Sequence, residues 1–328
     1  MKTKILVTGG AGFIGSNLVE KLTEDKNNLV IVLDNFSSGK MENLLSVKEK
    51  IKIIKGDITD KNLVDKITKR VDVVYHLAVV CLRVSLKNPQ ITHKVNATGT
   101  LNLLEASLKN KVKKFIYISS SEVYGTLIKV PMDEQHPTNP TTVYGASKLV
   151  GELYTKTFYL TYGFPCVIIR PFNTYGPREH FEGVYGEVIP KFLIRLLNNK
   201  PPVIFGDGTQ TRDFTYVEDT VKGIILAGNC IKAIGKTINI AKGEEVSINK
   251  IAQYLIELTG KFSIKPEYGK SRPADVKRHF ASIKLAKELL GYQPKIDIKT
   301  GLKKYIDWFL SQGYDFKRLI KKEKKYNW

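Results

Sequence analysis

A glycine-rich segment near the start of the chain, Thr8–Gly15 (TGGAGFIG), constrains the fold more than any other feature. It follows a short apolar run at 4–8 and leads into a helical pattern. Glycine permits positive φ angles and lets backbone amides approach a pyrophosphate, which the positive end of a helix attracts. The segment therefore predicts a dinucleotide-binding turn, with contacts from Gly9, Gly12, Phe13, Ile14 and Gly15.

Acidic residues follow the second and third expected strands. Asp34 ends the second one, where a carboxylate accepts hydrogen bonds from a ribose diol and repels a 2′-phosphate. The predicted cofactor is therefore NAD rather than NADP, and Asn35 lies beside the same ribose. After the third strand, Asp57 and Ile58 are placed to meet the adenine, although Asp57 is equally suited to cap the helix that follows.

Short apolar runs alternate with longer amphipathic stretches over the first 170 residues. The expected strands are 4–8, 29–34, 51–55, 71–77, 114–119 and 165–170, and the expected helices include 97–109 and 144–162. Continuous hydrophobic strands separated by helices indicate a parallel sheet that is buried on both faces. The predicted fold is therefore α/β, with a doubly wound parallel (Rossmann) sheet whose ligands bind beyond the carboxyl ends of the strands.

Prolines and loops break this alternation after Arg170. Helical patterns at 187–198, 218–229, 248–258 and 299–310 are mixed with short strand patterns near 203–205 and 237–240. We expect residues 1–170 to form the NAD-binding domain. Residues 171–328 are expected to form a smaller, irregular C-terminal α/β lobe that binds the substrate, with some elements returning to the sheet.

The chain is strongly basic, with 52 lysines and arginines against 32 acidic residues. Such a charge raises the possibility of nucleic-acid or membrane binding, but the one dense cluster, 321–325, is typical of a solvated helix face. No apolar run approaches the roughly 20 residues that span a bilayer. The three cysteines have neither disulfide nor metal spacing. We therefore expect a cytoplasmic protein that has no metal site and binds neither nucleic acid nor membrane.

A tyrosine and a lysine are spaced to share one face of the expected helix 144–162. Tyr144 and Lys148 are four residues apart, and an ammonium beside a phenol favours the phenolate that a general base requires. This spacing is common in a chain with 16 tyrosines, so the surroundings decide its meaning. The serine-rich end of the fifth strand supplies them, because the Ser120 hydroxyl there can hydrogen-bond a substrate oxygen that loses its proton.

These motifs, in this order, resemble the extended short-chain dehydrogenase/reductase family, and within it the NAD-dependent nucleotide-sugar epimerases and dehydratases. The resemblance runs nearly end to end and includes His76–Ala78, Asn96–Thr100, Ser119–Gly125, Arg170–Asn173, Gln210–Phe214 and Arg272–Asp275. It implies that Tyr144 is the catalytic base, that Lys148 holds the nicotinamide ribose, and that Ser120 is the hydroxyl partner. It also implies that Asn96 orients the active-site helices and that Leu77 and Ala78 line the cofactor.

The same resemblance implies where the substrate binds. Guanidinium groups suit phosphate oxygens, and the family positions that grip a nucleotide diphosphate are occupied by Asn173, Val188, Arg212 and Arg272, with Asp275 in the same motif. His279 occupies a position that restricts or admits bulky N-acetyl groups, so its size favours non-acetylated hexoses. The loop Val79–Arg83 departs from the usual family sequence at a place that touches the sugar.

The resemblance favours a 4-epimerase acting on a UDP-hexose through a transient 4-keto sugar, with NAD regenerated in each cycle. A nucleotide-sugar dehydratase is the alternative, because Glu122 keeps one of the two acidic residues that family dehydratases carry, whereas Ser121 replaces the other. An NAD-sensing or nucleic-acid-binding protein is the alternative of another class, and the intact Tyr/Lys pair argues against it. Family dimers pair helices such as 97–109 and 144–162, so a homodimer is expected.

Overall fold

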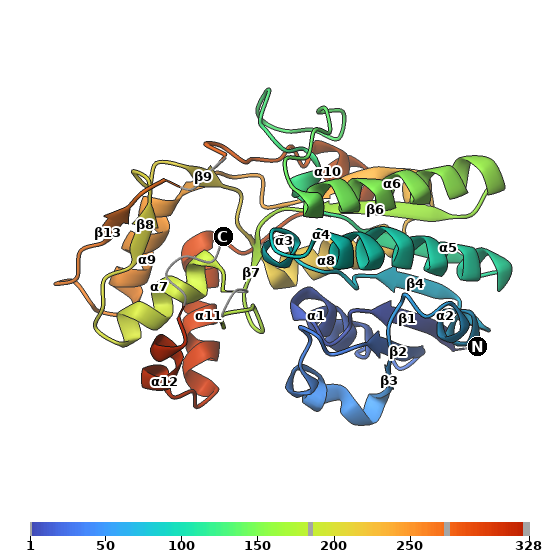
Figure 1. Cartoon of the computed structure of the whole chain (residues 1–328), viewed down its shortest axis with the longest axis horizontal. Helices are drawn as coiled ribbons and strands as arrows, with labels where there is room; N and C mark the ends of the chain where they lie inside the picture. The colour runs from blue at the N-terminus through green and yellow to red at the C-terminus, as the bar shows by residue number, and fades with distance from the viewer. Residues whose placement is uncertain (1, 183–185, 272–275, 324–328) are drawn as a thin grey trace.

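The computed structural model of the chain describes residues 2–182, 186–271 and 276–323 (Figure 1). These residues contain a seven-stranded sheet in which all neighbouring strands are parallel. The strand order is β11-β6-β5-β4-β1-β2-β3. The strands are β1 (Thr3–Thr8), β2 (Asn28–Asp34), β3 (Ile51–Lys55), β4 (Val73–His76), β5 (Lys114–Ile118), β6 (Cys166–Pro171) and β11 (Thr237–Ile240).

The order of these strands confirms the predicted doubly wound sheet. Reading outward from β1, the chain first builds β2 and β3 on one side and then β4, β5 and β6 on the other. The direction of winding therefore reverses between β1 and β4, and the loops after these two strands diverge at the carboxyl edge. Val7, Val32 and Ile116 in the central strands are fully buried, as expected for a sheet covered on both faces.

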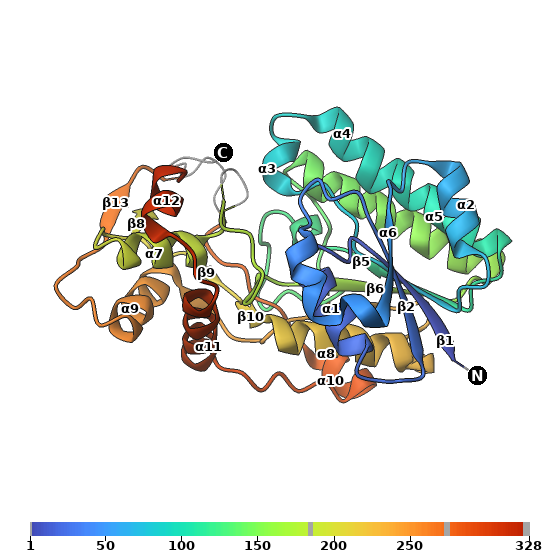
Figure 2. The ribbon, with the colours of Figure 1, turned by 90° about the horizontal axis from the view of Figure 1, so that it is seen from below.

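Helices cover both faces of the sheet (Figure 2). On one face α2 packs on α5, and α4 and α5 pack on α6. On the other face α1 packs against both the 3₁₀ helix η1 and α8, and α8 packs against α10. The first set is α2 (Lys61–Thr68), α4 (Pro89–His93), α5 (Thr100–Lys109) and α6 (Val143–Tyr162); the second is α1 (Phe13–Leu22), η1 (Met41–Lys50), α8 (Val217–Asn229) and α10 (Lys284–Leu290).

A separate group of elements lies beyond the carboxyl edge of the sheet, on the left of Figure 1, and is called here the outer helical cluster. Its helices share a hydrophobic core that includes Phe192, Leu255 and Phe309. Two short strand pairs, β8 with β13 and β9 with β12, accompany them. The elements are α7 (Val188–Leu197), β8 (Val203–Phe205), β9 (Thr211–Arg212), β12 (Val246–Ser247), α9 (Ile248–Leu258), β13 (Glu267–Gly269), α11 (Ile298–Ser311) and α12 (Phe316–Lys321).

Several elements that follow residue 171 belong to the main sheet or cover it. Strand β11 pairs with β6 along its whole length, and α8 packs against α1. The short parallel pair of β7 (Thr174–Tyr175) and β10 (Thr215–Tyr216) lies between the sheet and the outer helical cluster. Within the described residues, no helix is long and apolar enough to span a bilayer.

Candidate active site

A cavity of about 790 Å³ opens at the carboxyl edge of the sheet and extends to the outer helical cluster. The loops after β1, β2, β3, β4, β5 and β6 all contribute to its wall, as the reversal of winding requires. At its far end it is lined by Phe205, Gln210, Phe214 and Ile248. One continuous cleft therefore joins the glycine turn to the second half of the chain.

The glycine turn has no room for side chains. Gly9 has φ +70°, and a Cβ placed there would lie 2.7 Å from the Ala78 amide nitrogen. A Cβ on Gly15 would lie 2.1 Å from the Gly9 carbonyl oxygen. Helix α1 begins at Phe13, directly after Gly12, so its first amides face the cavity. This arrangement fits a pyrophosphate group at the helix start.

Asp34 lies at the end of β2 and lines the cavity. Its carboxylate accepts hydrogen bonds from the amides of Ala11 (2.9 Å) and Phe36 (2.8 Å), which fix its orientation. Burial raises the pKa of Asp34, although these two bonds oppose the shift. The fixed carboxylate is placed where a ribose diol would donate to it.

Asn35 and Asp57 form the next part of the wall, where the adenine was predicted to bind. The Asn35 amide donates to Asp57 Oδ2 at 2.7 Å, and Thr59 donates twice to Asp57 Oδ1. Burial opposes ionisation of Asp57, but these hydrogen bonds outweigh it and lower its pKa. The capping role considered for Asp57 belongs to Asp60, which accepts from the Leu63 amide at the start of α2. Ile58 also lines the cavity.

Tyr144 and Lys148 lie in the first turns of α6, which Thr142 caps by accepting from the Gly145 amide. The Lys148 ammonium donates to the Ile118 carbonyl oxygen at 2.5 Å and lies 4.3 Å from the centre of the Tyr117 ring. Burial lowers the pKa of Lys148 to about 7. Both side chains line the cavity, so the structure brings together the predicted pair.

Ser120 follows β5 and is hydrogen-bonded to the Tyr144 phenol. Burial raises the pKa of Tyr144 well above its usual value, and the bond with Ser120 opposes this shift. Ser120 also accepts from the Glu122 amide at 3.2 Å. Glu122 lines the same cavity, where burial raises the pKa of its carboxyl group. A hydroxyl, a phenol and a carboxyl group therefore meet at one place.

Asn96 connects the loop after β4 to α6 from behind the cavity wall. Its side chain bonds both backbone groups of Val80, at 2.8 and 3.0 Å, and donates to the Ser147 hydroxyl at 3.0 Å. Ser147 precedes Lys148, so Asn96 fixes the first turns of α6 relative to the loop. Leu77 and Ala78, which begin that loop, line the cavity directly.

The predicted substrate residues lie on the other side of the cleft. Asn173, Val188 and Arg212 line the cavity, and Val188 begins α7. The Arg212 guanidinium donates to the carbonyl oxygens of Thr211 (2.8 Å) and Val276 (2.7 Å). These bonds hold its charged group against the wall. Arg272 and Asp275 lie outside the described residues.

His279 is buried behind the cavity wall and is absent from its described lining. Its Nδ1 lies 3.3 Å from the Asn173 amide, and the ring is also hydrogen-bonded to the backbone carbonyl of Ser121. A carbonyl can only accept, so the ring donates to Ser121 and accepts from Asn173. Burial and the nearby Arg212 charge lower the pKa of His279 to about 4.

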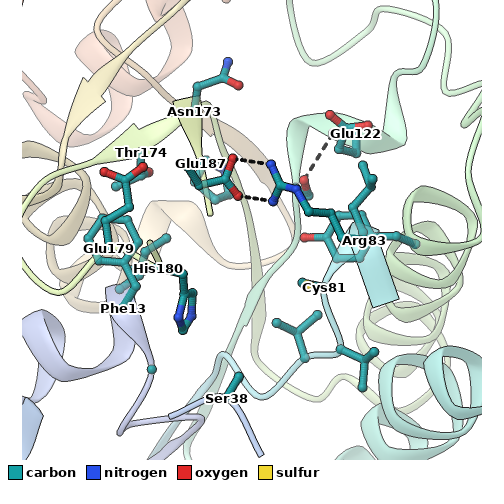
Figure 3. A pocket seen from close by; sticks show the side chains of 18 of the residues that line it. Phe13, Ser38, Cys81, Arg83, Glu122, Asn173, Thr174, Glu179, His180 and Glu187 are labelled. Carbon is teal, nitrogen blue, oxygen red and sulfur yellow. Dashed lines mark hydrogen bonds and ion pairs between the residues drawn. The ribbon is translucent and has the colours of Figure 1, made fainter. Parts of the chain in front are cut away.

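The structure adds an ion pair that sequence reasoning missed. Arg83, in the short helix α3 (Leu82–Ser85), binds both carboxylate oxygens of Glu187 at 2.5 and 2.7 Å. Figure 3 shows this pair inside the cavity, with Glu179 and His180 on the Glu187 side. The two residues are 104 positions apart, and nothing in the local sequence of either indicates the other.

A Rossmann sheet whose carboxyl edge carries a glycine turn, a serine and a Tyr/Lys helix defines an extended short-chain dehydrogenase/reductase. Within that class the chain belongs to the family described as GDP-mannose 4,6 dehydratase, which residues 6–305 match. The family resemblance predicted from the motifs is thereby confirmed.

Several known proteins are similar to the chain over nearly its whole length. A putative UDP-glucose 4-epimerase of Methanocaldococcus jannaschii is 42% identical, covering 93% of this chain and 97% of that protein. The structure of UDP-glucose 4-epimerase from Thermotoga maritima, solved with UDP-glucose, has a TM-score of 0.90 and 37% identity, covering 94% and 99%. That of UDP-glucuronic acid 4-epimerase from Bacillus cereus, solved with UDP-glucuronic acid and NAD, has a TM-score of 0.88 and 36% identity, covering 94% and 100%.

Proposed function

We propose that the chain is an NAD-dependent nucleotide-sugar 4-epimerase that acts on a UDP-hexose of the UDP-glucose/UDP-galactose type. The observation that carries this proposal is the meeting of Ser120, Tyr144 and Lys148 in a cleft that continues from the glycine turn to the outer helical cluster. Epimerases among the relatives, including one solved with UDP-glucose, support it.

The residues present fit NAD. Gly9 and Gly15 leave the space that a pyrophosphate needs at the start of α1, and Asp34 presents a fixed carboxylate to the ribose. The NAD in a solved relative supports this assignment. NAD held by these residues would supply the hydride acceptor for C4 of the sugar and the hydride donor for the later reduction.

Tyr144 is the general base that removes the proton of the sugar 4-hydroxyl. Burial favours the neutral phenol, so the phenolate depends on positive charge beside it. Lys148, four residues further along α6 and in the same cavity, is the cation placed to supply that charge. Ser120, bonded to the phenol, is placed to share the hydrogen bond with the substrate oxygen. When the ketone is reduced from the other face, Tyr144 returns the proton.

The diphosphate is assigned to the side of the cleft that carries Arg212. Two backbone carbonyls orient its guanidinium in the cavity wall, and a guanidinium suits phosphate oxygens. Asn173 and Val188 line the adjoining wall. We assign Arg272 to the same group on the resemblance alone.

A dehydratase is the second candidate, and Glu122 is the observation that favours it. Burial raises its pKa, which favours the acid form, and elimination of a sugar hydroxyl would use such a carboxyl group beside Tyr144. Ser121 occupies the neighbouring position where family dehydratases carry an aspartate. The second acidic group is therefore missing, and epimerisation is the better supported outcome.

A panel of nucleotide sugars separates the two reactions. The protein is incubated with UDP-glucose, UDP-glucuronate, UDP-N-acetylglucosamine and dTDP-glucose, and the products are followed by NMR. A C4 epimer of UDP-glucose is the expected product. A 4-keto-6-deoxy or unsaturated sugar would replace the epimerase proposal with the dehydratase.

We also propose a homodimer and a cytoplasmic location. Leu153 and Leu160 on the outer face of α6 are 55% and 68% exposed, and Ile91 is exposed on the neighbouring α4. An apolar helix face of this kind favours pairing with a second copy. Light scattering should give the dimer mass, and Leu160→Lys should shift it toward the monomer.

The cysteines support the proposed cytoplasmic location. The free thiols of Cys81, Cys166 and Cys230 suit a reducing compartment.

A further inference from the structure

The ion pair between Arg83 and Glu187 joins two sides of the cleft. Arg83 comes from α3, which follows β4, whereas Glu187 immediately precedes α7 of the outer helical cluster. Both Nη atoms of Arg83 are bound to the carboxylate. This is a two-bond arrangement, which fixes the geometry as well as the charge of the pair.

The pair lies where the sugar must lie. Arg83 and Glu187 line the same cavity as Tyr144, and the charge of Glu187 raises the pKa of Tyr144. In Figure 3 Cys81 and Glu122 lie on the Arg83 side of the pair. Because the sugar 4-hydroxyl must reach Tyr144, its neighbouring substituents come close to Arg83 and Glu187.

Two further carboxyl groups, those of Glu122 and Glu179, line the same cavity and lie close enough to be affected by the charge of Glu187. Burial is the main cause that raises the pKa values of Glu122 and Glu179, and the charge of Glu187 raises both further. Glu179 is buried and its side chain accepts from the Gly176 amide. A further anion placed here would face Glu187 directly, while the Arg83 fork is already occupied.

We propose that Glu187, by occupying Arg83, makes the sugar end of the cleft select uncharged hexoses and exclude hexuronates. This inference rests on the proposed epimerase function and names the substrate class of the same site. It concerns this chain's own residues, because a relative solved with UDP-glucuronic acid shows that a similar fold accepts an acidic sugar.

The exclusion follows from charge. A C6 carboxylate that bound Arg83 would have to break the two bonds between Arg83 and Glu187, and a carboxylate that did not bind Arg83 would lie beside the like charge of Glu187. A C6 hydroxymethyl group carries no charge and can bond either partner without separating them. The pair therefore favours a hydroxymethyl group by hydrogen bonding and disfavours a carboxylate by charge repulsion.

The test compares the wild type with Glu187→Gln, which keeps the shape and one acceptor oxygen but removes the charge. For each NAD-loaded protein, kcat/KM is measured for UDP-glucose and UDP-glucuronate. We expect the wild type to prefer UDP-glucose by at least about tenfold, and the variant to improve UDP-glucuronate relative to UDP-glucose by about tenfold or more. Glu218→Gln removes the same charge from an exposed pair with Lys304 outside the cavity and should leave the ratio unchanged.

Binding measured by calorimetry keeps this proposal separate from the reaction. If neither sugar is turned over but UDP-glucose binds more tightly than UDP-glucuronate, and Glu187→Gln narrows that gap, the epimerase proposal fails and the selectivity stands. Equal use of both sugars by the wild type would overturn the selectivity and point to another cation, such as Lys191, as the partner of the carboxylate. An unchanged ratio in a folded Glu187→Gln, judged by its melting temperature, would overturn it as well.

Discussion

Arg170 and Glu152 form a buried bidentate ion pair that ties β6 to the helix carrying Tyr144 and Lys148. The Arg170 guanidinium binds both carboxylate oxygens at 2.9 and 2.6 Å, and the two side chains are only 7% and 5% exposed. The guanidinium also lies 4.6 Å from the centre of the Tyr124 ring. Glu152 is one turn beyond Lys148 on α6 and favours the charged form of that lysine. The pair therefore supports the site both mechanically and electrostatically.

Glu152→Gln should destabilise the fold severely, because the variant leaves the Arg170 charge buried without its counterion. Removing one partner of a buried pair costs about 3–5 kcal/mol. Unfolding in urea measures this loss. Glu24→Gln, which breaks an exposed pair with Lys21, is the matched control and should cost less than about 1 kcal/mol. Equal effects of the two substitutions would mean that the buried ion pair stabilises the fold no more than the exposed one.

Tyr144→Phe should remove turnover while leaving the fold and the cofactor in place. The variant lacks the hydroxyl that we propose exchanges a proton with the sugar, and such a step contributes about 10²–10⁴-fold. We expect kcat to fall by at least about a hundredfold with unchanged affinity for UDP-glucose, measured by coupled assay and calorimetry. Tyr162→Phe, at the exposed end of the same helix, should keep the wild-type rate. A Tyr144→Phe enzyme as fast as the wild type would show that the base is misassigned.

Gly15→Ala should abolish NAD retention. The added Cβ would lie 2.1 Å from the Gly9 carbonyl oxygen, so the turn must open where the pyrophosphate binds. The NAD content of purified protein, read by absorbance after denaturation, measures the loss. Gly163→Ala is the control. It places an alanine at a position with positive φ at the end of α6, but its added Cβ meets nothing within 4 Å. It should lower stability by about 1–2 kcal/mol and leave NAD content unchanged.

Much of the fold was predictable because it depends on local signals. Buried parallel strands are continuous apolar runs, and the expected strand at 114–119 and helix at 144–162 agree with β5 and α6 to within one residue at each end. The place of β11 was not predictable in the same way. Its four residues read as one more short strand, and only long-range pairing with β6 puts them at the edge of the main sheet.

The same distinction applies to the candidate site: contacts that depend on local sequence were predictable, whereas contacts between distant segments were not. Tyr144 and Lys148 share one helix turn, and Ser120 marks a strand end, so their sequence positions already imply that they meet. The partners of Asn96 and the contact of Arg83 with Glu187 depend on how distant loops pack, which periodicity and motif spacing do not encode. His279 is an intermediate case: its position in the family resemblance indicated a role at the site, but its burial behind Asn173 emerged only from the fold.

Because the ring of His279 is neutral in the folded protein, the free energy of unfolding should decrease as the pH falls below 6.5. Its pKa is about 4 in the folded protein against an ordinary value of 6.5, chiefly because of burial. The folded state therefore binds fewer protons than the unfolded state between these values. The stabilisation is fully present above pH 6.5 and is lost as the pH falls toward 4, at about 1.4 kcal/mol per pH unit.

His279→Gln tests this dependence, since glutamine can still accept from Asn173 and donate to Ser121 but does not titrate. The free energy of unfolding of wild type and variant is measured in urea at pH 7 and pH 5. The destabilisation caused by the variant should be about 2 kcal/mol smaller at pH 5 than at pH 7. Only the wild type loses stability over this range, because only its unfolded state gains a proton on the ring. His93→Gln, on an exposed ring of α4, should give a small difference at both pH values. A destabilisation by His279→Gln that is the same at pH 7 and pH 5 would show that the ring is not held neutral between Asn173 and Ser121.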